Sequence, residues 1–451
     1  MKFFKNIHNN LTHVQVIAMG YLAVILLGTL LLLLPFSTRT GQSTDFLTAL
    51  YTAASATCVI GFVLVDTAMH WTLFGQLVIL LMIQIGGLGF MTMGILLAMI
   101  LKKRITLRAR GLLQESMNYM QMGGVVRLVR TALFGTLLFE GVGAVLLAVR
   151  FVPLFGFWKG TYYSIFHSIS AFCNAGFELM GSYSGEYSSL TAFSGDVLVN
   201  ITVIILTVAG GIGFFVWTDL RQNKLHFKKY MLHTKIAIST SLILLVGGMV
   251  FYLLFEWDNL LAGMSVGDKI LAAAFSSANA RTTGFNTVDP GSMTSASKLL
   301  TMVLMFIGGS PGSTAGGIKT VTLTVLIVYV WSNLRGSSGI NIFNRRLEGE
   351  TVRKASNVVM ISLLMAIGAA GFICFMQPEL PLEDVLFEVV AAIGTTGLST
   401  GLTREITGLS RAVMLVLMYC GRIGSMSFAL SLMEKKKAPP VKLPAEKIMI
   451  G

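Results

Sequence analysis

The sequence predicts an all-α integral membrane protein, in which four parallel-topology repeats of spanning helix, pore half helix and spanning helix surround one central pore. This architecture has eight spanning helices and four re-entrant half helices. Three observations predict it. The chain is 54% hydrophobic and 12% charged, whereas soluble domains carry about 25% charged residues. One short pattern occurs four times with a glycine at the same position, and the basic residues gather in separate segments.

The repeated pattern begins on a polar or cap-forming residue, continues with small and apolar residues, and ends on a glycine. Its four copies are residues 45–61, 160–176, 268–284 and 381–397. As a helix of about 12 residues, each copy would extend about 18 Å and reach halfway through a hydrocarbon core of about 30 Å. Irregular backbone at that depth is tolerated only where it is buried in protein or lines water. Four such segments around one axis therefore predict a pore.

The net charge of +13 follows the positive-inside rule for a multi-span protein. Most of the 34 Lys and Arg residues fall in five segments, residues 1–13, 102–130, 219–235, 333–354 and 435–451. These segments alternate with stretches richer in acids, which places both termini in the cytoplasm and every copy of the pattern on the outer side. The basic charge therefore orients helices in the lipid bilayer and argues against nucleic acid as a partner. A minor share of the basic residues is available to contact an acidic partner or anionic lipid.

The four repeats follow one another along the chain. Repeat 1 (residues 1–104) has predicted spans at 14–35 and 71–101, and repeat 2 (105–222) has them at 128–152 and 196–217. Repeat 3 (223–335) has them at 234–257 and 297–331, and repeat 4 (336–433) at 355–376 and 411–433. Residues 434–451 form a cytoplasmic C-terminal tail.

Glycines interrupt the second span of each repeat, in residues 84–90, 208–214, 306–320 and 419–425. Close helix packing in lipid accounts for the glycines of the first two interruptions. The third contains five glycines, a proline and three hydroxyl side chains, and glycine and proline weaken a helix strongly. It predicts a break with an intramembrane loop that lines a cavity. This loop comprises Gly308, Gly309, Ser310, Pro311, Gly312, Ser313, Thr314, Ala315, Gly316 and Gly317.

The end of each repeated pattern is suited to a dehydrated cation. Backbone carbonyls supply oxygen ligands without net charge, so an ion can bind and still leave. Glycine permits the positive φ that turns carbonyls inward, and the C-terminal end of a half helix carries partial negative charge. The alternative is a set of four tight turns in re-entrant hairpins. The predicted filter residues are Cys58, Val59, Ile60, Gly61, Cys173, Asn174, Ala175, Gly176, Arg281, Thr282, Thr283, Gly284, Gly394, Thr395, Thr396 and Gly397.

Charged side chains within predicted spans are costly and are usually paired or functional. Arg422 lies in the last span between glycines, and we expect it to contact the intramembrane loop; the alternative is a structural pair with Glu140. Lys319 follows the loop and is expected to snorkel to the cytoplasmic mouth. Arg281 is expected to pair with Glu388.

The predicted spans hold no acid–base or metal cluster, so the sequence predicts that the chain is not an enzyme and has no organic cofactor. The four cysteines all lie in apolar segments, which argues against disulfides and zinc sites.

Over nearly its whole length the chain resembles the Trk/Ktr/HKT superfamily of potassium transporters, and within it the membrane subunit of the Ktr uptake system. The stretches that carry the resemblance are SATCVIGF, QIGGLGFMT, FHSISAFCNAGF, GGIGF, ARTTGFN, LMFIGGSPGSTAGGIK and GRIGSMSF. The resemblance implies that potassium binds the backbone carbonyls of the filter, and that Gly61, Gly176, Gly284 and Gly397 line it. It further implies that residues 308–317 are the gate beneath the filter and that Arg422 contacts this gate.

The resemblance also implies a homodimer in the cell membrane that sits on a separate cytoplasmic RCK-type nucleotide-binding regulatory ring. Uptake in the family is often stimulated by sodium. The chain departs from its relatives at Cys58 and Ile60, where threonine is common, and in residues 173–175. The leading interpretation is a channel-like potassium-translocating subunit with sodium as an activator. The alternative is a symporter in which sodium and potassium are obligatorily coupled.

Overall fold

The computed structural model describes residues 12–101, 110–112, 114, 124–224, 226–336 and 339–432. Within these ranges the regular secondary structure is almost entirely helical, which confirms the predicted all-α class. The described residues form one hairpin, in which β1 (Asn341–Ile342) and β2 (Arg345–Arg346) pair antiparallel. The predicted tail at 434–451 and the predicted boundary between repeats 1 and 2 lie outside the described residues.

Among the described residues, four helices are each long and apolar enough to cross a membrane. They are α2 (His13–Leu32), α8 (Val125–Phe155), α13 (Leu232–Glu256) and α17 (Gly349–Met376). Each covers most or all of the first span predicted for one repeat, although α2 ends three residues before the predicted span does and α13 one residue before. Thr12 and Gln15 form a capping box at the start of α2, which satisfies main-chain N–H groups that the helix leaves free.

Four shorter helices correspond to the predicted half helices. They are α3 (Phe46–Cys58), α9 (Phe157–Cys173), α14 (Val266–Asn279) and α18 (Leu382–Gly394). The side chains of Asp45 and Ser265 cap α3 and α14 by accepting hydrogen bonds from main-chain N–H groups of the first turn. Helix α18 follows Pro381 and has Glu383 and Asp384 in its first turn, where the helix dipole favours negative charge.

The second span of each repeat is two helices rather than one. The pairs are α5 (Leu73–Leu88) with α6 (Phe90–Ile100), α11 (Val197–Gly211) with α12 (Phe214–Asn223), α15 (Ser295–Phe306) with α16 (Thr320–Leu334), and α19 (Gly408–Ile423) with α20 (Ser425–Leu432). Gly89, Gly213 and Gly424 adopt positive φ values of 82°, 101° and 97° at three of the breaks. The bend between α11 and α12 is 95°.

Close helix packing, the predicted role of the glycines at the first two interruptions, is therefore only part of their role. Gly86 and Gly87 do allow close contact, because a Cβ at either position would meet Thr57 or Cys173. Gly89 and Gly213 instead break the helix, since L side chains rarely adopt their backbone conformation.

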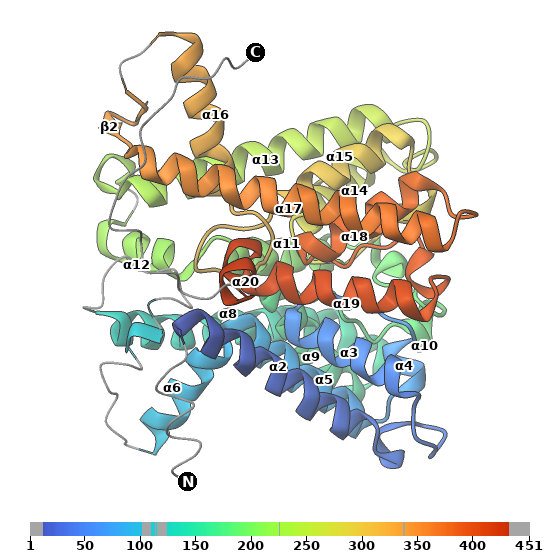
Figure 1. Ribbon diagram of the computed structural model, residues 1–451. Helices are drawn as coiled ribbons and strands as arrows, with labels where there is room; N and C mark the ends of the chain where they lie inside the picture. Colours follow the sequence, from blue (N-terminus) through green and yellow to red (C-terminus); the bar gives the residue numbers. More distant parts are fainter. Residues whose placement is uncertain are drawn as a thin grey trace.

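Short helices complete the connections between these elements. They are α4 (Thr67–His70), α10 (Gly181–Ser184), η1 (Pro35–Ser37), η2 (Thr191–Phe193), η3 (Phe227–Lys229), η4 (Pro290–Ser292) and η5 (Leu402–Arg404). Figure 1 shows the β-hairpin and α12 at one end of the molecule and α4 and α10 at the opposite end. We call the α4–α10 end the outer side and the other end the inner side.

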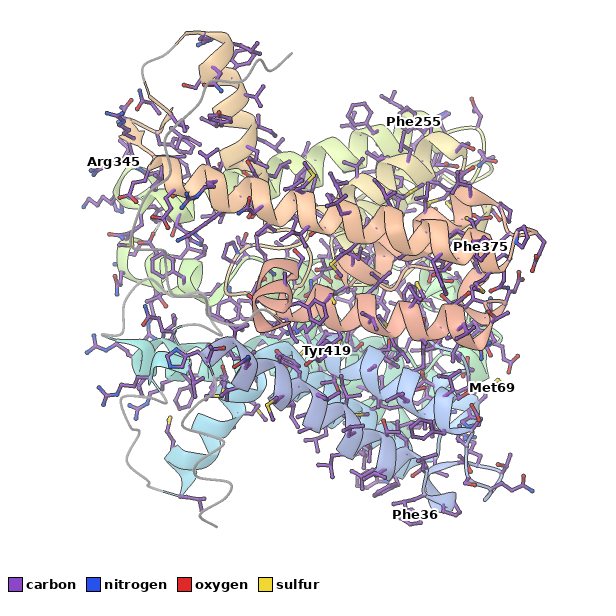
Figure 2. The ribbon with its side chains drawn as sticks, viewed as in Figure 1. Phe36, Met69, Phe255, Arg345, Phe375 and Tyr419 are labelled. Atoms are coloured by element: carbon purple, nitrogen blue, oxygen red, sulfur yellow. The ribbon has the colours of Figure 1, made fainter. Side chains whose placement is uncertain are left out.

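Small residues fill the centre of the molecule and large apolar residues cover its surface. Ala53, Ala171, Ala273 and Ala392 of the half helices are buried. The long helices expose residues such as Leu27, Leu138, Leu254 and Ile367 over 60% or more of their surface. Figure 2 shows Phe36, Phe255 and Phe375 projecting outward. An apolar surface of this kind suits contact with lipid tails, which are as apolar as leucine.

Candidate functional site

The residue two positions before each pattern glycine adopts a left-handed backbone conformation. The φ values are 58° at Val59, 62° at Asn174, 78° at Thr282 and 54° at Thr395. Three of these residues are β-branched, for which a positive φ is a strained outlier. Such strain persists only where the surrounding structure imposes it, and it is concentrated at functional sites. The four matching turns are therefore a candidate functional site.

Each pattern glycine lies against a carbonyl oxygen that belongs to the turn of another half helix. A Cβ atom added to any of these glycines would come within 3.0 Å of that oxygen. The pairs are Gly61 with Ala175, Gly176 with Thr283, Gly284 with Thr396, and Gly397 with Ile60. These contacts close on themselves, so the four carbonyls form a ring, which we call the carbonyl ring. A side chain at any of the glycines would displace main chain, because the glycines leave no space for it.

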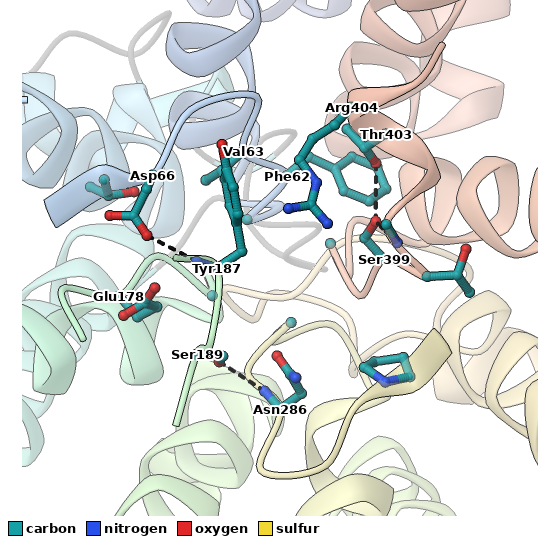
Figure 3. A pocket seen from close by; sticks show the side chains of 18 of the residues that line it. Phe62, Val63, Asp66, Glu178, Tyr187, Ser189, Asn286, Ser399, Thr403 and Arg404 are labelled. Carbon is teal, nitrogen blue, oxygen red and sulfur yellow. Dashed lines mark hydrogen bonds between the residues drawn. The ribbon is translucent and has the colours of Figure 1, made fainter. Parts of the chain in front are cut away.

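On the outer side the four glycines line a cavity of about 140 Å³. Figure 3 shows Asp66 and Glu178 at one edge of this cavity and Arg404 reaching over it. The Arg404 guanidinium lies 4.1 Å from the centroid of the Tyr187 ring. The pKa of the Glu178 carboxyl is raised to about 8, chiefly by burial and also by the neighbouring Asp66, while the hydrogen bond from the Met180 N–H opposes the rise.

Residues 181–193 follow the second half helix and are held at the mouth of the cavity. The Tyr187 N–H donates a hydrogen bond to Asp66 at 3.0 Å. The Asn286 N–H donates one to the Ser189 hydroxyl at 3.1 Å. The outer segment of one half helix is thereby tied to the outer segments of two others.

On the inner side, residues 307–319 connect α15 to α16 and lie under the turns; we call this segment the gate loop. A Cβ at Gly308 would meet the Thr282 side chain, and one at Gly316 would meet the Thr395 side chain. The ends of the loop are joined by a bridge between Ile307 and Ile318. The predicted break at 308–317 is confirmed, and the loop lies directly against the turns.

The gate loop is docked by main-chain hydrogen bonds onto the break between α11 and α12. The Ser310 N–H donates to the Gly211 carbonyl at 2.9 Å, and the Thr314 N–H donates to that of Gly210 at 3.2 Å. The Phe214 N–H donates to the Gly312 carbonyl at 2.9 Å. Helix glycines are needed here, since a Cβ at Gly210 would lie 2.8 Å from the Thr314 hydroxyl.

Arg422 joins the gate loop to the end of α5. Its guanidinium donates to the carbonyls of Thr314 and Gly86, and at 3.1 Å to that of Gly87. The last carbonyls of a helix have no partner within the helix, so Arg422 satisfies two of them near the end of α5. The expected contact between Arg422 and the loop is present in the structure, whereas the alternative pair with Glu140 is not: Glu140 accepts from Gln84 at 3.3 Å.

Two predicted roles of charged residues are wrong. The Arg281 guanidinium donates to the carbonyl and hydroxyl of Ser241 on α13, at 3.1 and 3.2 Å, and does not pair with Glu388. Glu388 accepts from the hydroxyls of Ser399 and Thr403 on its own outer segment. Lys319 does not snorkel, because its ammonium donates back to the loop carbonyls of Ala315, at 2.7 Å, and Gly316, at 3.2 Å.

The predicted filter residues occupy two positions relative to the ring. The ring carbonyls, their glycines and the left-handed residues all meet at the centre. The first residue of each predicted strand lies behind them, as the Cys173 thiol does against Gln84 at 3.6 Å. A Cβ at Gly394 would likewise meet the Met305 carbonyl. The filter role of all the predicted residues stays a prediction, including that of the residues behind the ring, Cys58, Cys173, Arg281 and Gly394.

Sequence reasoning missed the docking role of residues 210–214 and the contact of Tyr187 with Arg404. The density of glycines in residues 208–214 was the available signal for the first. The second joins two outer segments far apart in the chain, and no local pattern marks it.

The apolar helices and the central ring define a multi-pass membrane protein of the cation-transporter class. The chain belongs to the TrkH family, described as "Cation transport protein", whose profile matches residues 6–439. The family consists of transporters, so the chain is not an enzyme, as predicted.

Two curated relatives cover almost the whole chain. The chain is 39% identical to the potassium/sodium uptake protein NtpJ of Enterococcus hirae, over 99% of both chains. It is 38% identical to the Ktr system potassium uptake protein B of Bacillus subtilis, over 97% of this chain and 96% of that protein. The crystal structure of the potassium transporter TrkH from Vibrio parahaemolyticus matches with a TM-score of 0.69 at 16% identity, over 92% of this chain and 85% of that one. This last likeness supports the fold alone.

Proposed function

We propose that the chain is the pore-forming, ion-translocating subunit of a potassium uptake system. The observation that carries this proposal is the carbonyl ring at the meeting point of four half helices. Ring carbonyls can replace the hydration shell of a cation without binding it too tightly to leave. The half helices that lead into the turns add partial negative charge at their C-terminal ends.

The printed names of the relatives support potassium as the transported ion. One is a potassium/sodium uptake protein, and another is part of a Ktr potassium uptake system. In this proposal potassium binds the filter carbonyls, sodium acts as an activator, and no organic cofactor is needed. The chain acts as a homodimer on a cytoplasmic RCK-type regulatory ring, with both termini in the cytoplasm and the four repeats bounded as predicted above.

The gate loop controls passage through the ring in this proposal. It lies against the inner side of the turns, and main-chain hydrogen bonds together with Arg422 hold it there. The Arg422 charge also opposes a cation at this point until the loop and the arginine move apart.

A second candidate function is an obligatorily coupled sodium/potassium symporter. The name of the relative NtpJ, which includes both ions, favours it. Potassium uptake at an unchanged rate in the absence of sodium would exclude this candidate.

Potassium uptake in potassium-starved cells that lack their own uptake systems tests the proposed function. The chain is expressed with and without a ring subunit, and uptake is measured with and without sodium. We expect saturable uptake that Gly284→Ser abolishes or opens to sodium, because a side chain at Gly284 would displace the Thr396 carbonyl from the ring.

Gly41→Ser is the matched control. Gly41 also has a positive φ, of 70°, but no atom lies within 4 Å of its Cβ position. It should therefore retain uptake. Normal potassium selectivity in a well-inserted Gly284→Ser variant would contradict the filter assignment.

A further inference from the structure

Thr314 is the residue through which the gate loop reaches the filter turns by hydrogen bonds. Its hydroxyl lies 3.3 Å from Oδ1 of Asn174 and 3.2 Å from the carbonyl oxygen of Phe172. Apart from its bonds to the flanking helices α15 and α16, the other hydrogen bonds of the loop within the described part of the chain go to the α11–α12 break and to Arg422. Thr314 therefore occupies the point where loop and filter meet.

Asn174 passes this contact on to a second turn. Its Nδ2 donates a hydrogen bond to the Thr282 hydroxyl at 3.2 Å. Its side chain is almost fully buried, so both ends of the amide depend on protein partners. Thr314, Asn174 and Thr282 thus form one hydrogen-bonded chain from the gate loop to two left-handed turns.

The other turns have no side chain that could serve the same purpose. Val59 occupies the position of Asn174 in the first turn and carries no polar group. Thr395 occupies it in the fourth, and its hydroxyl has no hydrogen-bond partner. Asparagine combines a donor and an acceptor on one short side chain and tolerates a left-handed backbone better than most residues.

Gly210 makes the meeting of these groups possible. A Cβ at this position would lie 2.8 Å from both the Asn174 Oδ1 and the Thr314 hydroxyl. The glycine in α11 therefore leaves space for the contact between them.

We infer that Asn174 is a positioning residue that couples the gate loop to the filter, so that ion selection depends on where the loop lies. With the loop docked, Thr314 holds the Asn174 amide, and the amide holds the Thr282 side chain. When the loop moves away, the Asn174 amide loses its contact with Thr314. The turns that contain Asn174 and Thr282 are then held less firmly in position. This inference rests on the proposed function, since it assumes that the ring selects the ion.

Matched potassium and sodium fluxes into liposomes that contain the purified full-length chain test the coupling. Thr314→Val removes the hydroxyl at constant shape, and Thr282→Val removes the acceptor at the far end of the chain. We expect each to change the potassium-to-sodium flux ratio about three- to tenfold, the effect of one lost buried hydrogen bond. The double variant should change the ratio no more than either single variant, because both break one chain.

Two further variants separate coupling from a loss of packing. Thr314→Ser keeps the hydroxyl and should restore the wild-type ratio. Thr301→Val removes a buried hydroxyl bonded to Tyr252, away from the site, and should leave the ratio unchanged. A change in total flux at an unchanged ratio, or additive changes in the double variant, would overturn the inference. The wild-type potassium flux tests the proposed function itself, so the two failures are distinguishable.

Discussion

The two sides of the carbonyl ring are built differently. The outer side is a cavity of about 140 Å³ whose lining includes carboxyl and hydroxyl groups. The inner side is covered by the gate loop, which three main-chain hydrogen bonds and Arg422 fix in place. A site that is open on one side and covered on the other can exchange ions with one side only. In the proposed function, the inner side therefore controls passage, and the outer side controls how readily an ion arrives.

The breaks in the four second spans differ in the same way. Three breaks need a single glycine, at Gly89, Gly213 or Gly424. The fourth inserts residues 307–319 at the corresponding place. This segment is long enough to lie under the turns of other half helices, so one of four related positions has become the cover.

Of the changes considered, shortening the gate loop should have the largest effect on ion flux, because it removes part of the cover on the inner side. Deletion of residues 312–314 removes the bonds from Gly312 and Thr314, and each such bond contributes about 1 kcal/mol. Their loss should raise flux by about tenfold or more, by increasing the uncovered fraction. The ends of the loop are already joined by the bridge between Ile307 and Ile318, so the shortened loop can still connect α15 to α16. The measurement is potassium flux into liposomes, with deletion of residues 41–43 in an exposed outer segment as the control. Unchanged or lower flux from a well-folded deletion variant would show that the loop is no cover.

Removing the Arg404 charge should have a smaller effect, confined to the outer side. Arg404→Gln removes a positive charge from the cavity mouth, where it lowers the local concentration of cations. We expect the apparent potassium affinity to rise about threefold at low ionic strength and the difference to vanish at high salt. Arg345→Gln changes an exposed arginine at the opposite end of the molecule and is the control. A change in the maximal uptake rate, with no change in apparent potassium affinity, would instead indicate that Arg404 acts on the gate loop.

The smallest expected effect is a pH dependence of the outer side. The Glu178 carboxyl, with a pKa of about 8, is neutral below this pH and negative above it. Apparent potassium affinity should therefore rise slightly, by about twofold or less, as the outer pH increases through 8. Uptake titrated against outer pH measures it. Glu178→Gln should remove the step, and Glu186→Gln, at an exposed carboxyl of a nearby outer segment, should keep it. A step that survives in Glu178→Gln belongs to another group.

Local sequence patterns predicted the secondary-structure elements of this molecule more accurately than they predicted the contacts between those elements. The half helices and the break at 308–317 follow from apolar runs, caps and glycines, which act over a few residues. The equal position of Gly61, Gly176, Gly284 and Gly397 predicted that these residues would meet. The breaks at Gly89 and Gly213 were missed because a glycine that packs and a glycine with positive φ look alike in a sequence.

Pairings across the fold could not be predicted in the same way. The partner of Arg281 depends on how α14 lies against α13, and Ser241 carries no signal that distinguishes it from other serines. The docking of the gate loop on Gly210 and Gly211 uses main-chain groups, which every residue has. The contact between Arg422 and the loop was accessible because a buried arginine needs several acceptors and a glycine-rich loop leaves its carbonyls free.

Anomalous diffraction from crystals of the full chain grown with thallium, a heavy monovalent cation that replaces potassium, tests the central assignment most directly. We predict a thallium peak within coordination distance of the carbonyls of Ile60, Ala175, Thr283 and Thr396. Thallium bound elsewhere in the molecule, with none at the ring, would contradict the assignment of the carbonyl ring as the ion site.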